Sequence, residues 1–350
     1  MKELLRDLVA LPGCGAFEQP VGRYIAERAG RRADGVQTDG LGNVIAWKQG
    51  GRPGPTVMLS AHMDEVGFMV RKIEPSGLLR FEKLGGNDDR VMLSEHVIVH
   101  TQNGPVQGVV GTISCHMLKF DDRTRVRPYR DLYIDIGASD RAEAEQMGVQ
   151  LGDSVTWATP LQDLGPHRAM GHAFDDRAGC ALLLATLEEL DFSQLCGKVY
   201  FVFSTQEEVG LRGARVASQQ IGADVALAVD TTPASDTPEP VNDGTVRLGG
   251  GPAIKAMDHS LIANVAVRRH LVALAKQLGL PYQIEIFPGI GTDAGEMHKE
   301  KAGVPTGVIS IPSRYAHCPH EVIDWGDLDQ CKQLLAAFLQ SMEENTSFPG

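Results

Sequence analysis

Metal-ligating residue types stand beside short apolar runs at five places in this sequence. They are His62 with Asp64, Asp175 with Asp176, Glu207 with Glu208, Asp230, and the pair His317 and His320. Imidazole nitrogens and carboxylate oxygens are the ligands with which proteins hold zinc, cobalt and manganese. A centre with two such ions activates a water molecule and polarises a carbonyl group, while a free carboxylate acts as general base. The five motifs together therefore predict a hydrolytic centre that holds two divalent ions.

Each motif alone also has an ordinary structural explanation. A hydrogen-bonded histidine in a turn, two aspartates that begin a helix, and two glutamates in a solvated loop are all common. It is the repetition at the ends of apolar strands that favours the metal centre. The spacing leaves open whether His317 or His320 is the ligand, although Pro319 argues against one helix that presents both.

The apolar runs beside these residues predict the strands of one sheet. The runs cover residues 57–61, 199–203, 225–229 and 307–311. Uninterrupted apolar strands are expected where helices cover both faces of a sheet. Apolar stripes at helical spacing supply this cover over residues 177–190, 261–278 and 328–342. We predict an α/β fold with an open, mainly parallel central sheet, and such a sheet binds ligands beyond the carboxyl ends of its strands.

The stretch 69–158 differs from its surroundings because it has no long helical period. Turn pairs such as Asn103 and Gly104 separate short β-rich runs at residues 78–81, 96–99, 106–110 and 132–136. One short helix is expected over 141–147. We predict that 69–158 is a β-rich domain, inserted into a catalytic α/β domain that is formed by 1–68 and 159–350.

Composition and charge exclude several classes of partner. The 350 residues carry 45 acidic and 33 basic side chains, a net charge of −12, so a nucleic-acid backbone would be repelled. No apolar run approaches the ~20 residues that span a bilayer, and residues 1–7 are typical of an amphipathic helix rather than a signal peptide. Six scattered cysteines without a CxxC pair favour reduced thiols. We therefore expect a cytoplasmic protein that binds neither nucleic acid nor membrane.

Five segments of the chain resemble the glutamyl-aminopeptidase family of tetrahedral (TET) aminopeptidases. They occur in the order found in that family: AHMDEVGF at 61–68, AFDDRAG at 173–179, QEEVGLRGA at 206–214, VDTTPA at 229–234 and RYAHCPHE at 314–321. Residues 291–293 and 303–306 are also similar to family segments, so the resemblance covers nearly the whole chain. One departure is Cys318, where serine is more usual, and it bears on metal preference or oxidation rather than on the ligands.

The resemblance implies a role for each site residue. Asp175 would bridge both ions, and the peptide bond between Asp175 and Asp176 would be cis. His62 and Asp230 would complete the ligands of one ion, and Glu208 and His317 those of the other. Glu207 would act as general base, and Asp64 would orient His62. The resemblance further implies zinc or cobalt as the two ions of each subunit, with manganese as an alternative.

The resemblance also implies an activity and an assembly. Members of the family remove residues from the free N-termini of short peptides. They are zinc-peptidase-like in fold, and they carry a PDZ-like β-rich domain within the α/β domain. That domain builds dimers, which assemble into a dodecamer with the shape of a tetrahedral shell. The β-rich stretch of this chain falls where that domain is expected.

Three other functions deserve comparison with the aminopeptidase. A dinuclear carboxypeptidase or deacylase shares the type of catalytic domain, but Asp176 with Arg177 and the position of the β-rich stretch favour the aminopeptidase. A glycoside hydrolase needs two carboxyl groups roughly 5–9 Å apart and would not require His62, His317 or Asp230. A non-catalytic peptide-binding scaffold would not require an intact set of ligands and base.

Overall fold

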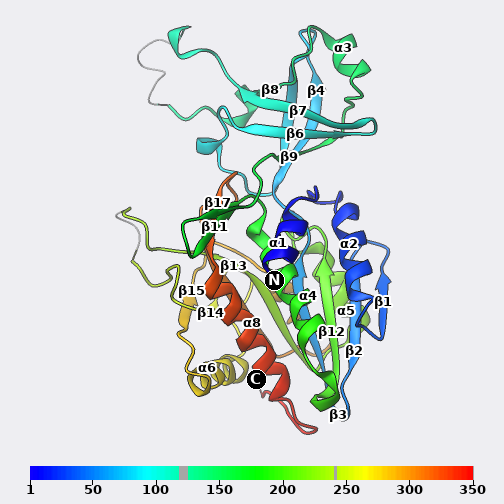
Figure 1. Cartoon of the computed structure of the whole chain (residues 1–350), viewed down its shortest axis with the longest axis vertical. Coiled ribbons are helices and arrows are strands. Elements are labelled where there is room, and N and C mark those ends of the chain that lie inside the picture. The colour runs from blue at the N-terminus through cyan, green and yellow to red at the C-terminus, as the bar shows by residue number, and fades with distance from the viewer. Residues whose placement is uncertain (118–124, 240–242, 350) are drawn as a thin grey trace.

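The computed structural model describes residues 1–117, 125–239 and 243–349 of the chain. These residues form a larger α/β part and a smaller β-barrel that stands at one end of it (Figure 1). Both termini of the chain belong to the larger part, while the barrel is formed by a stretch in the first half of the sequence. The larger part contains all the residues that the motifs single out.

An eleven-stranded sheet runs through the larger part of the described chain. Its centre consists of four parallel strands, in the order β12 (Cys196–Ser204), β3 (Arg52–His62), β13 (Val225–Pro233) and β16 (Thr306–Arg314). This arrangement confirms the predicted α/β class with a mainly parallel central sheet. Each of the four predicted apolar runs lies within one of these strands.

The margins of the sheet are antiparallel, which the sequence did not predict. Beyond β12 lie β2 (Val44–Gln49) and β1 (Gly35–Thr38). Beyond β16 lie β17 (Glu321–Asp324), β11 (Arg168–Gly171) and β10 (Gln162–Leu164). A branch at β16 consists of β14 (Ala253–Met257), which is antiparallel to β16, and β15 (Gln283–Ile286), which is parallel to β14. Short marginal strands of this kind lack the long apolar runs that identified the central four.

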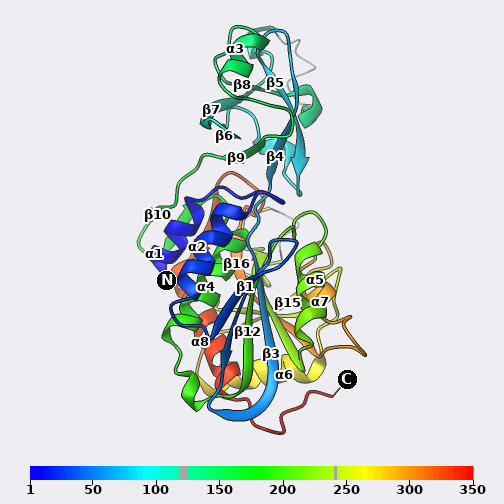
Figure 2. The same cartoon turned by 90° about the vertical axis from the view of Figure 1, so that its right-hand side faces the viewer.

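Helices cover both faces of the sheet, as Figure 2 shows for α4 and α5. One face is covered by α1 (Lys2–Val9), α2 (Gln19–Ala29), α4 (Phe174–Glu189) and α8 (Trp325–Gln340). The opposite face is covered by α5 (Arg212–Ile221) and α7 (Ala294–Met297). At the margin, α6 (Val265–Gln277) packs against α8 and β14.

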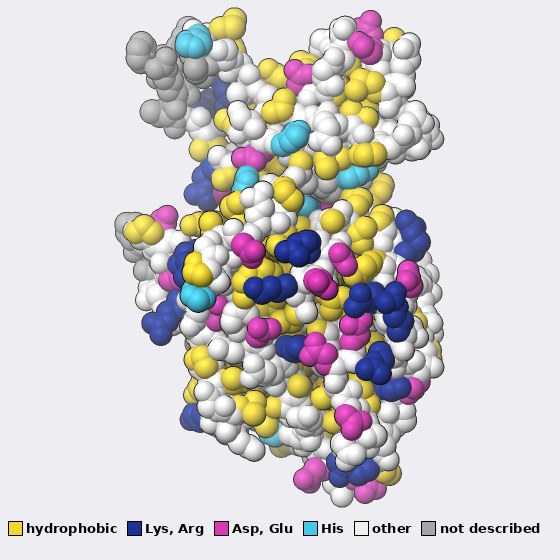
Figure 3. Space-filling model, viewed as in Figure 1, with side chains coloured by type: hydrophobic (Ala, Val, Ile, Leu, Met, Phe, Trp, Pro, Cys, Tyr) yellow, Lys and Arg dark blue, Asp and Glu magenta, His cyan; other side chains and the backbone are white. Residues whose placement is uncertain are grey.

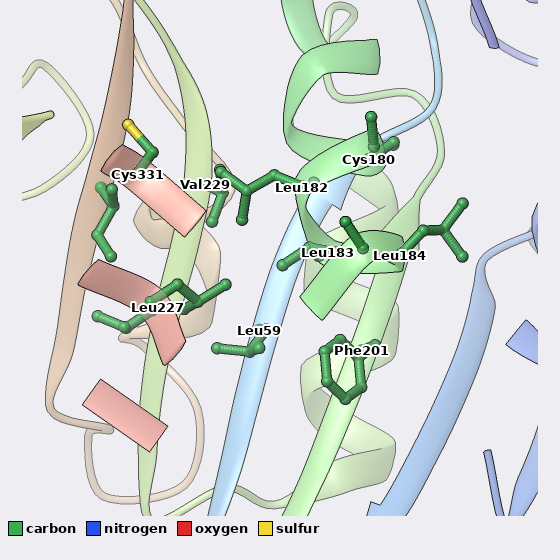
Figure 4. Close-up of a cluster of buried hydrophobic side chains, with 14 of the residues drawn as sticks. Leu59, Cys180, Leu182, Leu183, Leu184, Phe201, Leu227, Val229 and Cys331 are labelled. Carbon is green, nitrogen blue, oxygen red and sulfur yellow. The ribbon is translucent and has the colours of Figure 1, made fainter. Parts of the chain in front are cut away.

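Neighbouring residues of the central strands contribute to two different cores. Because successive side chains of a strand point to opposite faces, one set packs with α4 and α8 (Figure 4): Leu59, Phe201, Leu227 and Val229. The alternate set packs with α5 and α7: Met58, Val202, Ala226 and Ala228. Full burial of a large apolar side chain contributes roughly 1.5–3 kcal/mol, so these two cores hold the strand ends in a fixed arrangement.

Three predicted helices begin at other residues than expected. The helix α8 begins at Trp325, before the predicted start at 328, because the side-chain oxygen of Asp324 accepts the N–H of Gly326 at 2.8 Å and caps the helix. The helix α6 begins at Val265 and not at Leu261, because the side-chain oxygen of Asn264 accepts the N–H of Val267 at 3.0 Å and caps the helix. Leu261 is buried in the core that packs with α5 and α7, which is why it fitted the apolar period. In contrast, α4 begins at Phe174, before the predicted start at 177, with irregular backbone angles in its first turn.

The smaller part is a closed barrel with its own hydrophobic core. Its strands, in spatial order, are β4 (Gly67–Ile73), β5 (Leu79–Leu84), β8 (Tyr133–Asp135), β7 (Gly104–Gly111), β6 (His96–Thr101) and β9 (Ser154–Trp157). The ring of Phe68 lies 4.9 Å from those of Phe81 and Trp157, and Ala144 of α3 (Arg141–Gln146) joins this core. Each of the six strands pairs with two others, although β5 and β8 pair only between Leu79 and Ile134.

The surface of the larger part carries charges of both signs. Acidic and basic side chains are interspersed on the face that Figure 3 shows. Among the helices of the described residues, none combines the length and the apolar character needed to cross a membrane. The described cysteine side chains are free thiols, and that of Cys115 lies outside the described residues.

Candidate metal centre

The predicted site residues meet at the carboxyl ends of the four parallel strands. His62 ends β3 and lies in register with Ser204, which ends β12. The other residues follow within a short distance along the chain: Glu207 and Glu208 after β12, Asp230 in β13, and His317 after β16. Because parallel strands end at the same edge of a sheet, four segments that are distant in sequence converge there.

Asp175 lies between the two histidines of this cluster. Its Oδ1 is 3.0 Å from Nε2 of His62, and its Oδ2 is 3.6 Å from Nε2 of His317. The peptide bond between Asp175 and Asp176 is cis, as the resemblance implied. The carboxylate of Asp175 therefore presents one oxygen to each side of the cluster.

Two groups of potential ligands share Asp175. One group adds His62 and Asp230, whose Nε2 and Oδ1 atoms lie 3.8 Å apart, and the other adds Glu208 and His317, whose Oε1 and Nε2 atoms lie 3.2 Å apart. Ligand atoms about 2.1 Å from a tetrahedral zinc ion lie roughly 3.4 Å from one another. The separations in both groups are close to this value, so the donor atoms fit two ions with Asp175 between them.

Two further observations bear on the ligand set. Oε1 of Glu208 is buried and has no hydrogen bond within the described part of the chain, and a metal ion would satisfy this oxygen. His320, which the spacing left as an alternative to His317, has an exposed side chain whose Nδ1 lies 4.0 Å from Glu95. The structure thus brings His317 into the cluster and leaves His320 outside it.

Asp64 supports both sides of the cluster. Its backbone carbonyl oxygen is 3.0 Å from Nδ1 of His62, and its carboxylate oxygen Oδ1 is 3.5 Å from the same nitrogen. The two carboxylate oxygens accept the backbone N–H groups of Glu207 at 2.9 Å and Glu208 at 3.2 Å. Asp64 therefore contacts the His62 ring and also holds the segment that carries the two glutamates, a contact that the sequence did not predict.

Burial governs the acid–base properties of the carboxyl groups. It raises the pKa of Glu207, Glu208 and Asp230 above that of an exposed carboxyl group, because the charged form loses its hydration. Neighbouring carboxylates raise these pKa values further. Like charges at this edge of the sheet are thus unfavourable unless a positive charge joins them.

The imidazoles supply that positive charge when no ion is bound. Burial disfavours a charged ring at His317, yet the carboxylates of Glu208 and Asp175 raise the pKa of His317 to about 12. The pKa of His62 also rises despite burial, because of Glu207 and Asp175. Burial works against the charged form of Asp175 too, but the imidazoles of His317 and His62 hold its pKa well below the usual range. Metal ions compete with these ring protons, because an imidazole must be neutral to bind a metal.

Glu321 is a site residue that the motif reading missed. One of its oxygens accepts the backbone N–H of Asp175 and the other accepts that of His317, both at 3.0 Å. A single carboxylate thereby joins the segment of His317 to Asp175, which lies 146 residues before Glu321 in the sequence. The position of Glu321 at the end of the RYAHCPHE segment is the sequence feature that could have identified it as a site residue. Burial and the charge of Asp175 raise the pKa of Glu321 to about 8.

Asp176 and Arg177 anchor the start of α4 beneath the cluster. The carboxylate of Asp176 accepts the backbone N–H groups of His62 at 3.2 Å and Gly179 at 2.9 Å. The guanidinium of Arg177 is fully buried and donates to the backbone carbonyls of Met63 and Leu8, both at 2.6 Å. These contacts fix α4, and hence Asp175, against β3.

A cavity of about 590 Å³ opens in front of the cluster. Apolar side chains on its wall include Leu211, Pro233 and Ile290, and Asp88 adds a carboxylate that is paired with Arg90 at 2.6 Å. Among the described residues that line the cavity, there is no lysine and no arginine. The cavity is therefore acidic where it meets the cluster and apolar at its wall, and it has the size of a typical small-ligand site.

Relatives of known activity match nearly the whole chain. The family pattern described as M42 glutamyl aminopeptidase matches residues 42–334. The lysyl aminopeptidase of Pyrococcus furiosus is 34% identical over 346 residues, which cover 97% of each chain.

Solved structures agree with the sequence comparison. An aminopeptidase from the archaeon Desulfurococcus kamchatkensis is 38% identical and has a TM-score of 0.93, over 97% of this chain and 94% of that chain. The TET1 peptidase of Pyrococcus horikoshii is 32% identical and has a TM-score of 0.87, over 97% of this chain and 98% of that chain. The chain described here belongs to the M42 glutamyl aminopeptidase family.

Proposed function

We propose that this chain is an aminopeptidase that removes N-terminal residues from short peptides with the help of two bridged divalent ions. The observation that carries the proposal is the position of Asp175, whose two oxygens face His62 and His317. Membership of the family supports the activity, since one relative is a lysyl aminopeptidase. The distances between the imidazole nitrogens and the carboxylate oxygens support the binding of two ions.

The proposed ligands follow from the two groups that share Asp175. One ion is held by His62, Asp175 and Asp230, and the other by Asp175, Glu208 and His317. Imidazole and carboxylate together suit zinc or cobalt, and manganese is the alternative. The raised pKa of the imidazoles implies that both rings release a proton when the ions bind.

Glu207 is the proposed general base. When bound, two ions of this kind lower the pKa of a water molecule and polarise the carbonyl group of a peptide bond. Glu207 lies 3.9 Å from Nε2 of His62. It forms a third potential ligand group with His62 and Glu208, but it lies outside the two groups that share Asp175. Its carboxylate takes a proton from the attacking water and passes it to the nitrogen of the leaving peptide. Burial raises the pKa of Glu207, which makes its carboxylate a better proton acceptor.

The cavity supports a peptide with a cationic end and a neutral first side chain. Five carboxylates line it, at Asp88, Asp175, Glu207, Glu208 and Asp230. Two divalent ions leave this set close to neutral or slightly negative, which favours a free α-amine over an acidic group. The apolar wall offers a surface for an uncharged first side chain, and the absence of lysine and arginine from the described lining disfavours an acidic one.

Substitutions at the two adjacent glutamates distinguish the proposed role of general base from that of metal ligand. Glu207→Gln removes the base and should lower kcat by about 10²–10⁴-fold while both ions stay bound. Glu208→Gln removes a ligand and should weaken the binding of one ion. Steady-state kinetics together with metal analysis by mass spectrometry checks both results. Equal loss of metal from the two variants would contradict this division of roles.

A peptide with a free or an acetylated N-terminus tests the type of reaction. A peptide that begins with leucine should lose single residues in steps, and its N-acetylated form should stay intact, because the acetylated end has no amine to anchor. Mass spectrometry of the products distinguishes the outcomes. Internal fragments, removal of the acetyl group or release from the C-terminus would instead indicate an endopeptidase, a deacylase or a carboxypeptidase.

The matched control is the same peptide with glutamate in the first position. It should be cleaved at least about tenfold more slowly than the leucine peptide, because neither lysine nor arginine lines the described cavity to receive a carboxylate. Faster cleavage of the glutamate peptide would contradict the proposed fit of the first side chain and leave the aminopeptidase activity in place.

We also propose a cytoplasmic assembly in which the barrel is a PDZ-like inserted domain that builds dimers and, from these, a dodecamer. The TET1 peptidase of Pyrococcus horikoshii assembles into a tetrahedron or a large octahedral shell. The separate core of the barrel supports a role outside the catalytic part. Light scattering should give a mass several times the 37.8 kDa of one chain, and smaller particles after replacement of 69–158 by a short linker. A mass that the replacement leaves unchanged would contradict this role.

A further inference from the structure

The segment 205–208, which carries the two adjacent glutamates, is held by side chains and not by a neighbouring strand. Four consecutive backbone N–H groups each donate to a side-chain oxygen. The pairs are Thr205 to Asn43 Oδ1 at 3.0 Å, Gln206 to Glu18 Oε1 at 3.0 Å, Glu207 to Asp64 Oδ1 at 2.9 Å and Glu208 to Asp64 Oδ2 at 3.2 Å. Three side chains therefore replace the ladder of hydrogen bonds that ends with β12.

The backbone of this segment needs such support. Gln206 has φ of 55°, in the left-handed region that costs free energy for a residue other than glycine. The carbonyl oxygen of Glu207 then accepts the N–H groups of Gly210 and Leu211, both at 2.9 Å, which closes a tight turn. A turn of this kind persists only where the surrounding structure fixes it.

Asn43 links the beginning and the end of the turn. Its side-chain Nδ2 donates to the backbone carbonyl of Gly213 at 3.0 Å and to Asp39 Oδ2 at 2.7 Å. A Cβ atom at Gly213 would lie 2.3 Å from the Asn43 side-chain oxygen, so only glycine permits this approach. Asn43 is thus fixed on two sides before it meets Thr205.

Glu18 contacts the turn from the N-terminal part of the chain. It precedes α2, it is only 4% exposed, and it lies 188 residues before Gln206 in the sequence. It does not line the 590 Å³ cavity in front of the cluster, but a separate cavity of about 270 Å³ that also contacts Gly42 and Thr205. Glu18 therefore contacts the catalytic segment through the backbone N–H of Gln206 and not through the cavity.

We propose that Glu18 is a positioning residue that fixes the backbone of Gln206 and thereby the direction of the Glu207 carboxylate. The inference rests on the proposed role of Glu207 as general base. Of the three side chains that accept the backbone N–H groups of 205–208, Glu18 is the one that precedes α2, and it alone accepts from Gln206. Asp64 alone leaves Gln206 without an acceptor, and a misplacement of about 1 Å lowers catalysis by about 10²-fold.

Substitutions at Glu18 test the proposal through kinetics. Glu18→Ala removes the acceptor and should lower kcat roughly 10- to 100-fold, with KM within about threefold of the original chain and both ions retained. Glu18→Gln keeps an oxygen at the same reach and should recover most of kcat. Glu18→Asp keeps the charge but shortens the reach, and it should resemble the alanine variant. If the alanine variant does not fold, the contrast between glutamine and aspartate decides the question.

Asp327→Ala is the matched control. Asp327 is also a buried carboxylate, 1% exposed, and it accepts two backbone N–H groups, of Gly249 and Gly251, at 2.7 Å each. It lines neither of the two cavities described above. Its removal should lower the melting temperature without the fall in kcat. An equal fall in kcat for Asp327→Ala and Glu18→Ala would contradict a positioning role.

Hydrogen exchange separates this proposal from the proposed function. Exchange of the amides in 205–211 should accelerate in Glu18→Ala and stay near that of the original chain in Glu18→Gln, because local opening exposes these amides. This result does not depend on turnover. Unchanged exchange in Glu18→Ala would overturn the positioning role, whereas an original chain that cleaves no peptide would overturn the proposed function alone.

Discussion

Carboxylates crowded at one buried edge of the sheet need positive charge, and the arrangement of the site depends on this requirement. Burial of an unpaired charge costs several kcal/mol, and like charges add to that cost. The nearby guanidinium of Arg177 does not meet the need, since it is committed to backbone carbonyls and to Glu65. The ammonium of Lys255 is likewise committed, to Glu285 and Asp258. Protonated imidazoles balance the cluster without ions, and divalent ions are the stronger alternative.

The fold brings the carboxylates and imidazoles together and fixes their positions. Four parallel strands deliver residues from distant parts of the chain to one edge, and two cores keep the strand ends in register. A second set of carboxylates accepts backbone N–H groups and joins the motifs to each other. Glu321 joins the segments of Asp175 and His317, and Asp64 joins those of His62 and Glu207. Such support arranges the ligands in advance, so less conformational entropy is lost when an ion binds.

The central strands and the candidate ligands were predictable because each combines a long apolar run with a local motif. The antiparallel margins were not, since short strands with mixed burial have no distinct period. Glu18, Asn43 and Glu321 also escaped prediction, because an acceptor for a distant backbone N–H leaves no local pattern. The same holds for the closure of the barrel, which depends on pairing between strands far apart in sequence. Asp64 was predictable only in part. Its contact with His62 is between near neighbours in the sequence, whereas its contacts with 207–208 join distant segments.

The shared position of Asp175 is the central claim, and metal stoichiometry tests it most directly. The metal-free chain is titrated with zinc, and bound metal is measured per chain after removal of the excess. The account predicts two ions for the original chain, one for Asp230→Asn, and severe loss of both for Asp175→Asn, because both groups use that carboxylate. One ion or none at saturating zinc in the original chain, or loss of a single ion in Asp175→Asn, would contradict it.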